Sequence, residues 1–162
     1  MEKPPNSSDL FEVSRRCGAI KEDPARIIFR QLVQSTLELH QLGVLHRDLK
    51  DENCLIDTET LQMKIIDFGC ATEYDDQNVY TRMSGTPEFF APEIFGERGY
   101  RAESSTVWTL GTLLYVILLG DIPFETTDDI LKGNRQMKVI YITAQIYLKV
   151  LKMISQCNYF IF

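Results

Sequence analysis

The stretch that decides the fold of this chain is His-Arg-Asp-Leu-Lys-Asp-Glu-Asn, residues 46–53. It sets a carboxylate, an ammonium and an amide at its third, fifth and eighth positions. Two triplets follow it, Asp-Phe-Gly at residues 67–69 and Ala-Pro-Glu at residues 91–93. A single Asp or Asn in such a stretch most often hydrogen-bonds within its own turn. An ordered set of three motifs at these spacings indicates instead that they share one functional site.

In this order they are the catalytic-loop, metal-loop and activation-segment motifs of protein kinases. The chain therefore resembles a protein kinase, and most closely the Pim family of serine/threonine kinases. Residues 43–48, 79–81 and 120–125 are Pim-like beyond the motifs that all kinases share. Thr106 stands two residues before the single tryptophan, where most kinases carry Asp and Pim kinases do not.

The resemblance implies a catalytic role for Asp48, Lys50, Asn53 and Thr86. Asp48 would accept the hydrogen bond of the substrate hydroxyl, and Lys50 would meet the transferring phosphate. Thr86 would bridge these two side chains. Asn53 and Asp67 would hold Mg²⁺, an ion that takes few protein ligands and prefers oxygen. The alternative is that the Asp and Asn residues only cap turns.

Further side chains match family positions around ATP and the peptide substrate. ATP contacts are implied for Glu2, Asp9, Glu52, Leu55, Ile66 and Asp67, and substrate contacts for Glu12 and Asp51. The alternative for Leu55 and Ile66 is that they are strand core. The alternative for the acidic residues is a solvated surface.

Three further side chains near the motifs are expected to have structural or anion-binding roles. Arg47 either anchors an anion in the activation segment or braces a turn. His46 is expected to brace the catalytic loop rather than to transfer protons. Phe68 is expected to pack and thereby set the position of Asp67.

The apolar periodicity predicts several helices and two short strands. The resemblance implies the fold of a kinase carboxy-terminal lobe, which is mainly α with short β-hairpins. Asp9 and Asp23 are expected to cap helices, the second with Ile27, Val33 and Leu37 widening its apolar face. A third helix is expected over residues 107–119 with Ser104 or Ser105 as cap, and a fourth over residues 126–132. Short strands are expected at residues 54–56 and 63–66.

The two ends of the chain set the expected domain limits. Glu2-Lys3-Pro4 is similar to the Pim hinge, and no glycine-rich loop or strand lysine is found. We therefore expect residues 1–134 to be a partial kinase domain, the hinge and carboxy-terminal lobe, without the β-rich amino-terminal lobe. Residues 135–162 are expected to be a divergent tail.

Composition restricts the class of partner. The net charge of −6 argues against nucleic acid and anionic membranes and suits basic peptides, although an acidic surface also serves solubility alone. The four cysteines form no C-x-x-C pair, so reduced thiols are expected. The resemblance implies a cytoplasmic protein, with the nucleus as the alternative, and a monomer for the complete kinase.

Two functions remain open at this point. The first is a serine/threonine kinase that uses ATP and Mg²⁺ on arginine-rich protein substrates. The alternative is a catalytically impaired, truncated kinase lobe that acts as a binding module or is an incomplete gene product. We expect the 162-residue chain alone to be nearly inactive.

Overall fold

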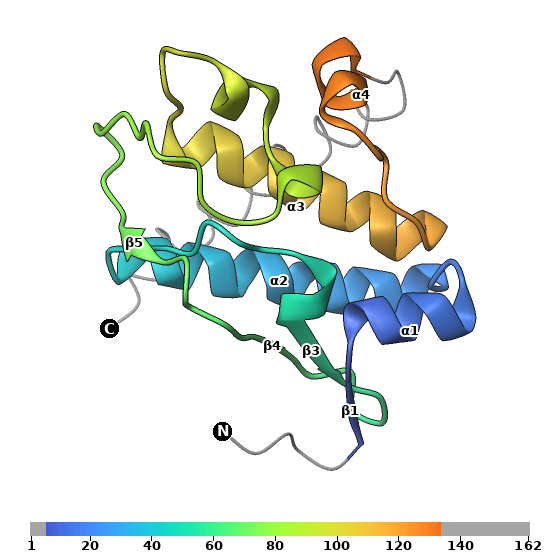
Figure 1. Cartoon of the computed structure of the whole chain (residues 1–162). Helices are drawn as coiled ribbons and strands as arrows, with labels where there is room; N and C mark the ends of the chain where they lie inside the picture. Colours follow the sequence, from blue (N-terminus) through green and yellow to red (C-terminus); the bar gives the residue numbers. More distant parts are fainter. Residues whose placement is uncertain (1–5, 134–162) are drawn as a thin grey trace.

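The computed structural model describes residues 6–133, which form helices and short strands (Figure 1). The helices are α1 (Leu10–Cys17), α2 (Glu22–Gln41), α3 (Ala102–Leu119) and α4 (Thr127–Lys132). The strands are β1 (Ser7–Asp9), β2 (Val44–Leu45), β3 (Cys54–Asp57), β4 (Met63–Ile65) and β5 (Thr72–Glu73). Three short 3-10 helices complete the set: η1 (Asp51–Asn53), η2 (Pro87–Phe89) and η3 (Pro92–Phe95). The mainly helical composition with short strands is as predicted.

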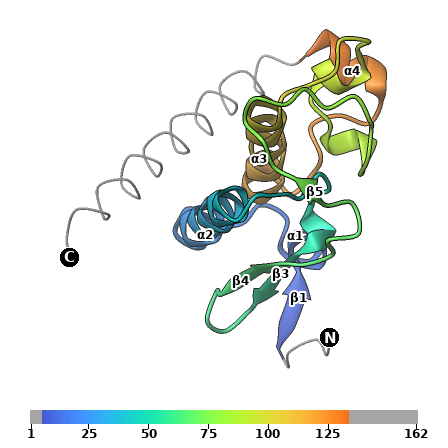
Figure 2. The ribbon, with the colours of Figure 1, turned by 90° about the vertical axis from the view of Figure 1, so that its left-hand side faces the viewer.

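The long helices α2 and α3 form the frame of the molecule. Figure 2 looks along both helices and shows them next to each other, with β1, β3 and β4 on the side away from α4. The largest core cluster joins side chains of α1, α2 and α3 to those of β3 and β4. The segment between β5 and α3 contacts the loop after β2 through Thr86, and it contacts α3 through the Phe89 carbonyl oxygen.

Helix α2 buries one face at helical spacing, as its sequence predicts. Ile28, Leu32 and Val33 are buried, but Ile27 is 47% exposed, so its predicted place on the apolar face is wrong. Asp23 is not the N-cap either. The helix begins at Glu22, and Asp23 lies in the first turn, where its charge favours the positive end of the helix dipole.

Helix α3 begins earlier than its sequence predicts. Arg101 takes the N-cap position, so the expected cap at Ser104 or Ser105 is wrong. Both hydroxyls instead donate to backbone carbonyls three residues back, at 3.2 and 3.1 Å. By length and composition α3 qualifies as a membrane-spanning segment, yet 61% of it is buried within the protein. Its packing is that of a core helix.

Two small antiparallel sheets carry the loops of the candidate site. The first has the order β1-β3-β4, and the predicted hairpin of β3 and β4 is confirmed. The second pairs β2 with β5, with Leu45 opposite Thr72. Strands β1, β2 and β5 were not predicted, because runs of two or three residues carry no recognisable alternation. The β2–β5 pair ties the residues before the catalytic loop to those after Asp-Phe-Gly.

The predicted cap of α1 is confirmed, and α4 has a cap that was not predicted. Asp9 accepts a hydrogen bond from the Glu12 backbone N–H at 2.8 Å and so caps α1. Thr126 and Asp129 form a capping box at the start of α4, which ends before Gly133. Glu2 and the predicted tail of residues 135–162 lie outside the described residues.

Replacing a buried leucine of α3 tests this packing. Leu113 is 0% exposed, so we expect Leu113→Ala to lower the free energy of unfolding by about 2–5 kcal/mol. Leu119→Ala, on the same helix at a position 50% exposed, is the matched control and should cost about 0.5 kcal/mol or less. Urea denaturation measures both changes, and equal losses would contradict the assigned core.

Candidate active site

A hydroxyl, a carboxylate and an amide meet at the loop between β2 and η1. The Thr86 hydroxyl donates to Asp48 Oδ1 at 2.8 Å. The Asn53 side-chain amide donates to the Asp48 carbonyl oxygen at 2.8 Å and to Asp48 Oδ2 at 3.3 Å. Three of the four predicted catalytic residues are therefore in contact, and both carboxylate oxygens of Asp48 are held in place.

His46 braces this loop from the buried side. Its Nδ1 accepts a hydrogen bond from the Asp48 backbone N–H at 3.2 Å, and its Nε2 lies 3.1 Å from the Ile66 carbonyl oxygen. A carbonyl can only accept, so the proton of the neutral imidazole belongs on Nε2. Burial lowers the pKa of His46 below 6.5, against the opposing effects of Ile66, Asp48 and Asp67. The geometry is that of the brace we expected.

Arg47 also braces the loop. Its backbone is in the left-handed region with φ of 64°, which turns the loop sharply before Asp48. Its Nε donates to the Cys70 carbonyl oxygen at 2.7 Å. Of the two hypotheses for Arg47, this contact favours the brace, because it fixes the segment that follows Asp-Phe-Gly.

Lys50 does not contact Thr86 in this structure. Its ammonium pairs with Glu52 Oε2 at 2.6 Å, and that hydrogen bond is the main cause of a raised Lys50 pKa. The structure thus shows the Asp48 side of the predicted Thr86 bridge but not the Lys50 side. Glu52, predicted to reach ATP, is instead the partner of Lys50 and is largely exposed.

The two predicted metal ligands are arranged so that oxygen atoms are available. Because the Asn53 amide nitrogen faces Asp48, its carbonyl oxygen points elsewhere. Asp67 is exposed, has φ of 62°, and accepts the Gly69 backbone N–H on Oδ1 at 3.1 Å. Within residues 6–133, no group of three or more His, Cys, Asp or Glu side chains is arranged to hold a metal ion. One amide oxygen and one carboxylate fit Mg²⁺, which completes its shell with water and phosphate oxygens.

Three apolar side chains line the surface beside these ligands. Leu55 on β3 and Ile66 after β4 are both half-buried, so part of each remains accessible to a ligand. The Ile66 N–H donates to the Asn53 carbonyl oxygen at 2.9 Å, which joins the two metal-ligand segments. Phe68 packs against His46 with ring centroids 4.9 Å apart but is 46% exposed. Its expected packing is therefore only partial.

The predicted acidic residues separate into two groups. Asp9, Glu12 and Glu52 line one open groove of about 570 Å³, together with Arg15 and other residues of α1. Asp51 differs from them in being only 6% exposed, with its Oδ1 accepting the Glu52 N–H at 3.1 Å. Burial raises the pKa of Asp51. Asp51 thus belongs to the interior of η1, and its predicted contact with a substrate stays a prediction.

Comparison with known proteins agrees with this geometry. The family described as "Protein kinase domain" matches residues 1–159 of the chain. The chain belongs to the protein kinase domain family. This kinase domain is 43% identical over 133 residues to serine/threonine-protein kinase pim-2 of Danio rerio, covering 82% of this chain and 43% of that protein.

Two further relatives are similar over nearly the same stretch. Serine/threonine-protein kinase prk-2 of Caenorhabditis elegans is 43% identical over 80% of this chain and 29% of its own length. Serine/threonine-protein kinase PSK2 of Saccharomyces cerevisiae is 38% identical over 79% of this chain and 11% of its own length. The chain thus spans less than half the length of each relative. The division of the chain near residue 134 stays a prediction.

Gly85 is a site residue of this kinase domain that sequence reasoning missed. A Cβ at this position would lie 2.3 Å from the Arg47 carbonyl oxygen and 3.2 Å from Asp48 Oδ1. Only glycine therefore lets the activation segment approach closely enough for Thr86 to reach Asp48. The signal in the sequence was a glycine directly before Thr86, but its contact is with a residue 38 positions earlier.

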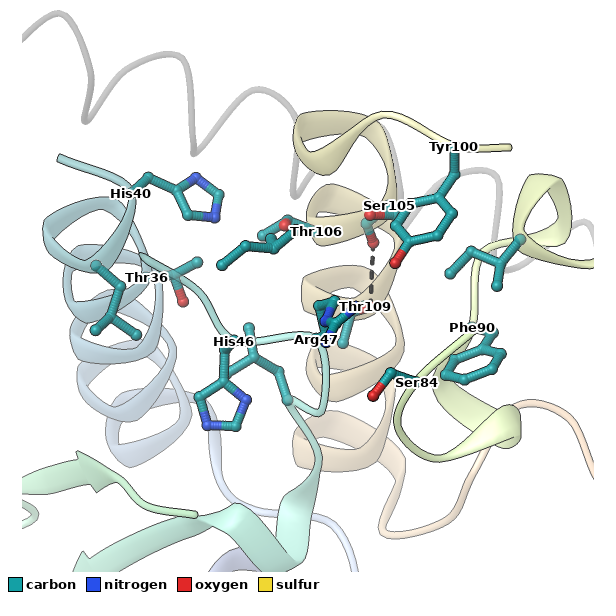
Figure 3. Close-up of a pocket in the computed structure, with 14 residues that line it drawn as sticks. Thr36, His40, His46, Arg47, Ser84, Phe90, Tyr100, Ser105, Thr106 and Thr109 are labelled. Carbon is teal, nitrogen blue, oxygen red and sulfur yellow. Dashed lines mark hydrogen bonds between the residues drawn. The ribbon is translucent and has the colours of Figure 1, made fainter. Parts of the chain in front are cut away.

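A small cavity lies behind the catalytic loop of the kinase domain (Figure 3). Thr36 and His40 of α2 line one side, Tyr100 and Phe90 the other, with Arg47 between them. Its volume is about 30 Å³, enough for a water molecule. Thr106, the position where most kinases carry Asp, is part of the lining.

Substituting Gly85 tests the close approach. Gly43→Ala is the matched control, because Gly43 also has positive φ but a Cβ added there would meet nothing within 4 Å. We expect Gly43→Ala to cost about 1–2 kcal/mol of unfolding free energy from backbone conformation alone. Gly85→Ala should cost a further 1–3 kcal/mol, roughly the penalty of overpacking. Chemical denaturation compares them, and equal costs would contradict the steric argument.

The neutral state of His46 predicts a pH dependence. His46 binds a proton less readily in the folded protein than in the unfolded chain. The contribution of neutral His46 to the free energy of unfolding is therefore complete above pH 6.5, and it is lost as the pH falls below 6.5. We expect the wild-type free energy of unfolding to fall by up to about 1.4 kcal/mol per pH unit more steeply than that of His46→Asn. Denaturation between pH 5 and 7.5 measures the slopes. Equal slopes in the wild type and in His46→Asn would contradict the assignment.

Proposed function

We propose that this chain orients the acceptor hydroxyl and holds Mg²⁺·ATP in a Pim-type serine/threonine protein kinase. The observation that carries the proposal is the contact of Thr86 and Asn53 with the two carboxylate oxygens of Asp48. Membership of the kinase domain family and the 43% identity to pim-2 support it. The described residues would form the carboxy-terminal lobe, which agrees with their mainly helical composition.

Asp48 is placed to act on the incoming hydroxyl. A substrate serine or threonine would donate its hydrogen bond to the Asp48 carboxylate and attack the γ-phosphorus of ATP. The bond from that phosphorus to the ADP oxygen breaks, and the hydroxyl proton passes to Asp48. Thr86 and Asn53 keep the carboxylate oriented, so little rearrangement is needed at this step.

The negative charge of the transferring phosphate would be neutralised by Mg²⁺ and by Lys50. Asn53 and Asp67 would hold Mg²⁺, which neutralises the negative charge of the ATP phosphates. Lys50 would approach the phosphate after exchanging its present partner Glu52 for it. The Lys50–Glu52 pair is largely exposed on the Glu52 side, so this exchange costs little.

Basic peptides are the proposed substrate class. The chain has a net charge of −6, and Asp9, Glu12 and Glu52 share one open groove close to Lys50. Arginine side chains pair well with such carboxylates. Arg15 and Arg16 on the same groove would restrict where those positive charges can sit.

The decisive test uses protein that contains this chain, Mg²⁺·ATP and an arginine-rich serine peptide. We expect transfer of phosphate to serine, and a fall of roughly 10²–10⁴-fold in kcat for Asp48→Asn, the range for loss of a general base. Asp57→Asn is the control, since Asp57 accepts hydrogen bonds only within the β3–β4 turn. Chelation of Mg²⁺ should abolish transfer in both.

Other results would contradict this proposal. If the wild type binds the peptide but transfers no phosphate, the function is that of a binding module. If Asp48→Asn and Asp57→Asn have equal activity, Asp48 is not the catalytic base. The expectation that the 162-residue chain alone is nearly inactive stays a prediction, and the same assay checks it.

A further inference from the structure

The open groove along α1 carries charges of both signs. Its carboxylates belong to Asp9, Glu12 and Glu52, and its guanidinium groups belong to Arg15 and Arg16 in the last turn of α1. Both arginines are exposed. The groove measures about 570 Å³, a size typical of ligand sites. A purely basic peptide would use the three carboxylates and would give the two arginines no ligand group.

The arginines hold most of the unused binding capacity of the groove. Neither Arg15 nor Arg16 joins an ion pair with another side chain of residues 6–133. Arg15 lies over the ring of Phe11, with its guanidinium carbon 5.7 Å from the centroid, a contact that leaves its N–H groups available. A guanidinium has five N–H donors and no acceptor, and it binds carboxylate and phosphate oxygens best. Two such groups on neighbouring residues favour a negatively charged ligand.

The carboxylates of the groove, by contrast, are partly occupied. Asp9 Oδ1 accepts the Glu12 backbone N–H at 2.8 Å, and Glu52 Oε2 pairs with the Lys50 ammonium at 2.6 Å. Each of these two carboxylates keeps a second oxygen that can accept from a cation of the ligand. The groove can therefore hold a positive and a negative side chain of the same peptide.

The direction of α1 sets the order of these charges. Asp9 pairs with Leu55 between β1 and β3, and η1, which carries Glu52, contacts both β1 and α1. Figure 1 shows α1 extending from β1 away from β3. Arg16 follows Asp9 by seven residues, which is about 10 Å along the helix axis. An extended peptide spans this distance in about three residues. Seen from the catalytic loop, the arginines lie beyond the carboxylates.

We propose that Arg15 and Arg16 form a specificity subsite for an anionic side chain of the peptide, acidic or phosphorylated, about three residues from the peptide's arginine. The inference deepens the proposed kinase function, and the description of the peptide as a substrate rests on that function. Basic residues in the last turn also stabilise a helix through its dipole. That role alone would not distinguish one peptide from another.

Binding of matched peptides to the full chain tests the subsite without phosphate transfer. The probe is a fluorescent serine peptide with one arginine and with Asp, phosphoserine or Ala three residues from it, on the side away from the serine. The series is made in both chain directions. By fluorescence anisotropy we expect the Asp peptide to bind about 5-fold more tightly than the Ala peptide. The phosphoserine peptide should bind about 20-fold more tightly, because phosphate carries more charge and more acceptor oxygens.

The three affinities also distinguish the two sources of the anion. A gain for both anionic peptides means that a carboxylate is sufficient, and a gain for phosphoserine alone identifies a phosphorylated ligand. Equal affinities of all three peptides in both directions would overturn the proposal.

Substitutions decide whether the two arginines cause the preference. In Arg15→Gln/Arg16→Gln the ratio of the affinities should fall to about 1. In Arg15→Glu/Arg16→Glu a peptide with Lys at the tested position should bind more tightly than the Ala peptide. Arg26→Gln/Arg30→Gln is the matched control, because it removes the same charge from exposed positions of α2 that do not line the groove. A preference that survives in Arg15→Gln/Arg16→Gln, or that is lost in the control, would overturn the proposal.

Activity separates this inference from the proposed function. In protein that transfers phosphate, kcat/KM should be about 5-fold higher for the Asp peptide than for the Ala peptide, with kcat unchanged, the sign of uniform binding. If phosphate is transferred without this preference, the kinase proposal stands and the subsite fails. If the anionic peptides bind more tightly but no phosphate is transferred, the subsite stands and the kinase proposal fails.

Discussion

The candidate site depends on one neutral imidazole. His46 accepts the backbone N–H of Asp48 and faces the carbonyl of Ile66, the residue before Asp67. One buried ring therefore fixes the backbone next to both carboxylates that the proposed chemistry needs. A protonated ring would have no acceptor for the Asp48 N–H, so the arrangement holds only while the imidazole is neutral.

Two residues near His46 have a strained backbone. Arg47 and Asp67 both have positive φ, at 64° and 62°, which is unfavourable for residues other than glycine. Each is compensated by a local contact: Arg47 by the Cys70 carbonyl, and Asp67 by the Gly69 N–H. Arg47 directly follows His46 in the chain, and Asp67 directly follows Ile66, whose carbonyl oxygen faces the imidazole.

The sequence predicted elements that depend on local pattern and missed those that depend on distant contacts. Helix α2 and the β3–β4 hairpin follow from periodicity, and the motif residues Asp48, Asn53 and Thr86 were found and do meet. Gly85 was missed because its neighbour is the Arg47 carbonyl, far away in sequence. The burial of Asp51 could not be predicted for the same reason, since it depends on the packing of α1 against η1.

These distant contacts explain how an irregular segment stays ordered over residues 67–93. Its ends are fixed by the β2–β5 pair and by Thr86 on Asp48, and its middle by the exchange of hydrogen bonds between Tyr80 and Tyr100. The ties at the two ends lead back to the loop of residues 43–48. A segment without regular structure can hold a hydroxyl on a carboxylate because its order is supplied by that loop, where the proposed chemistry takes place.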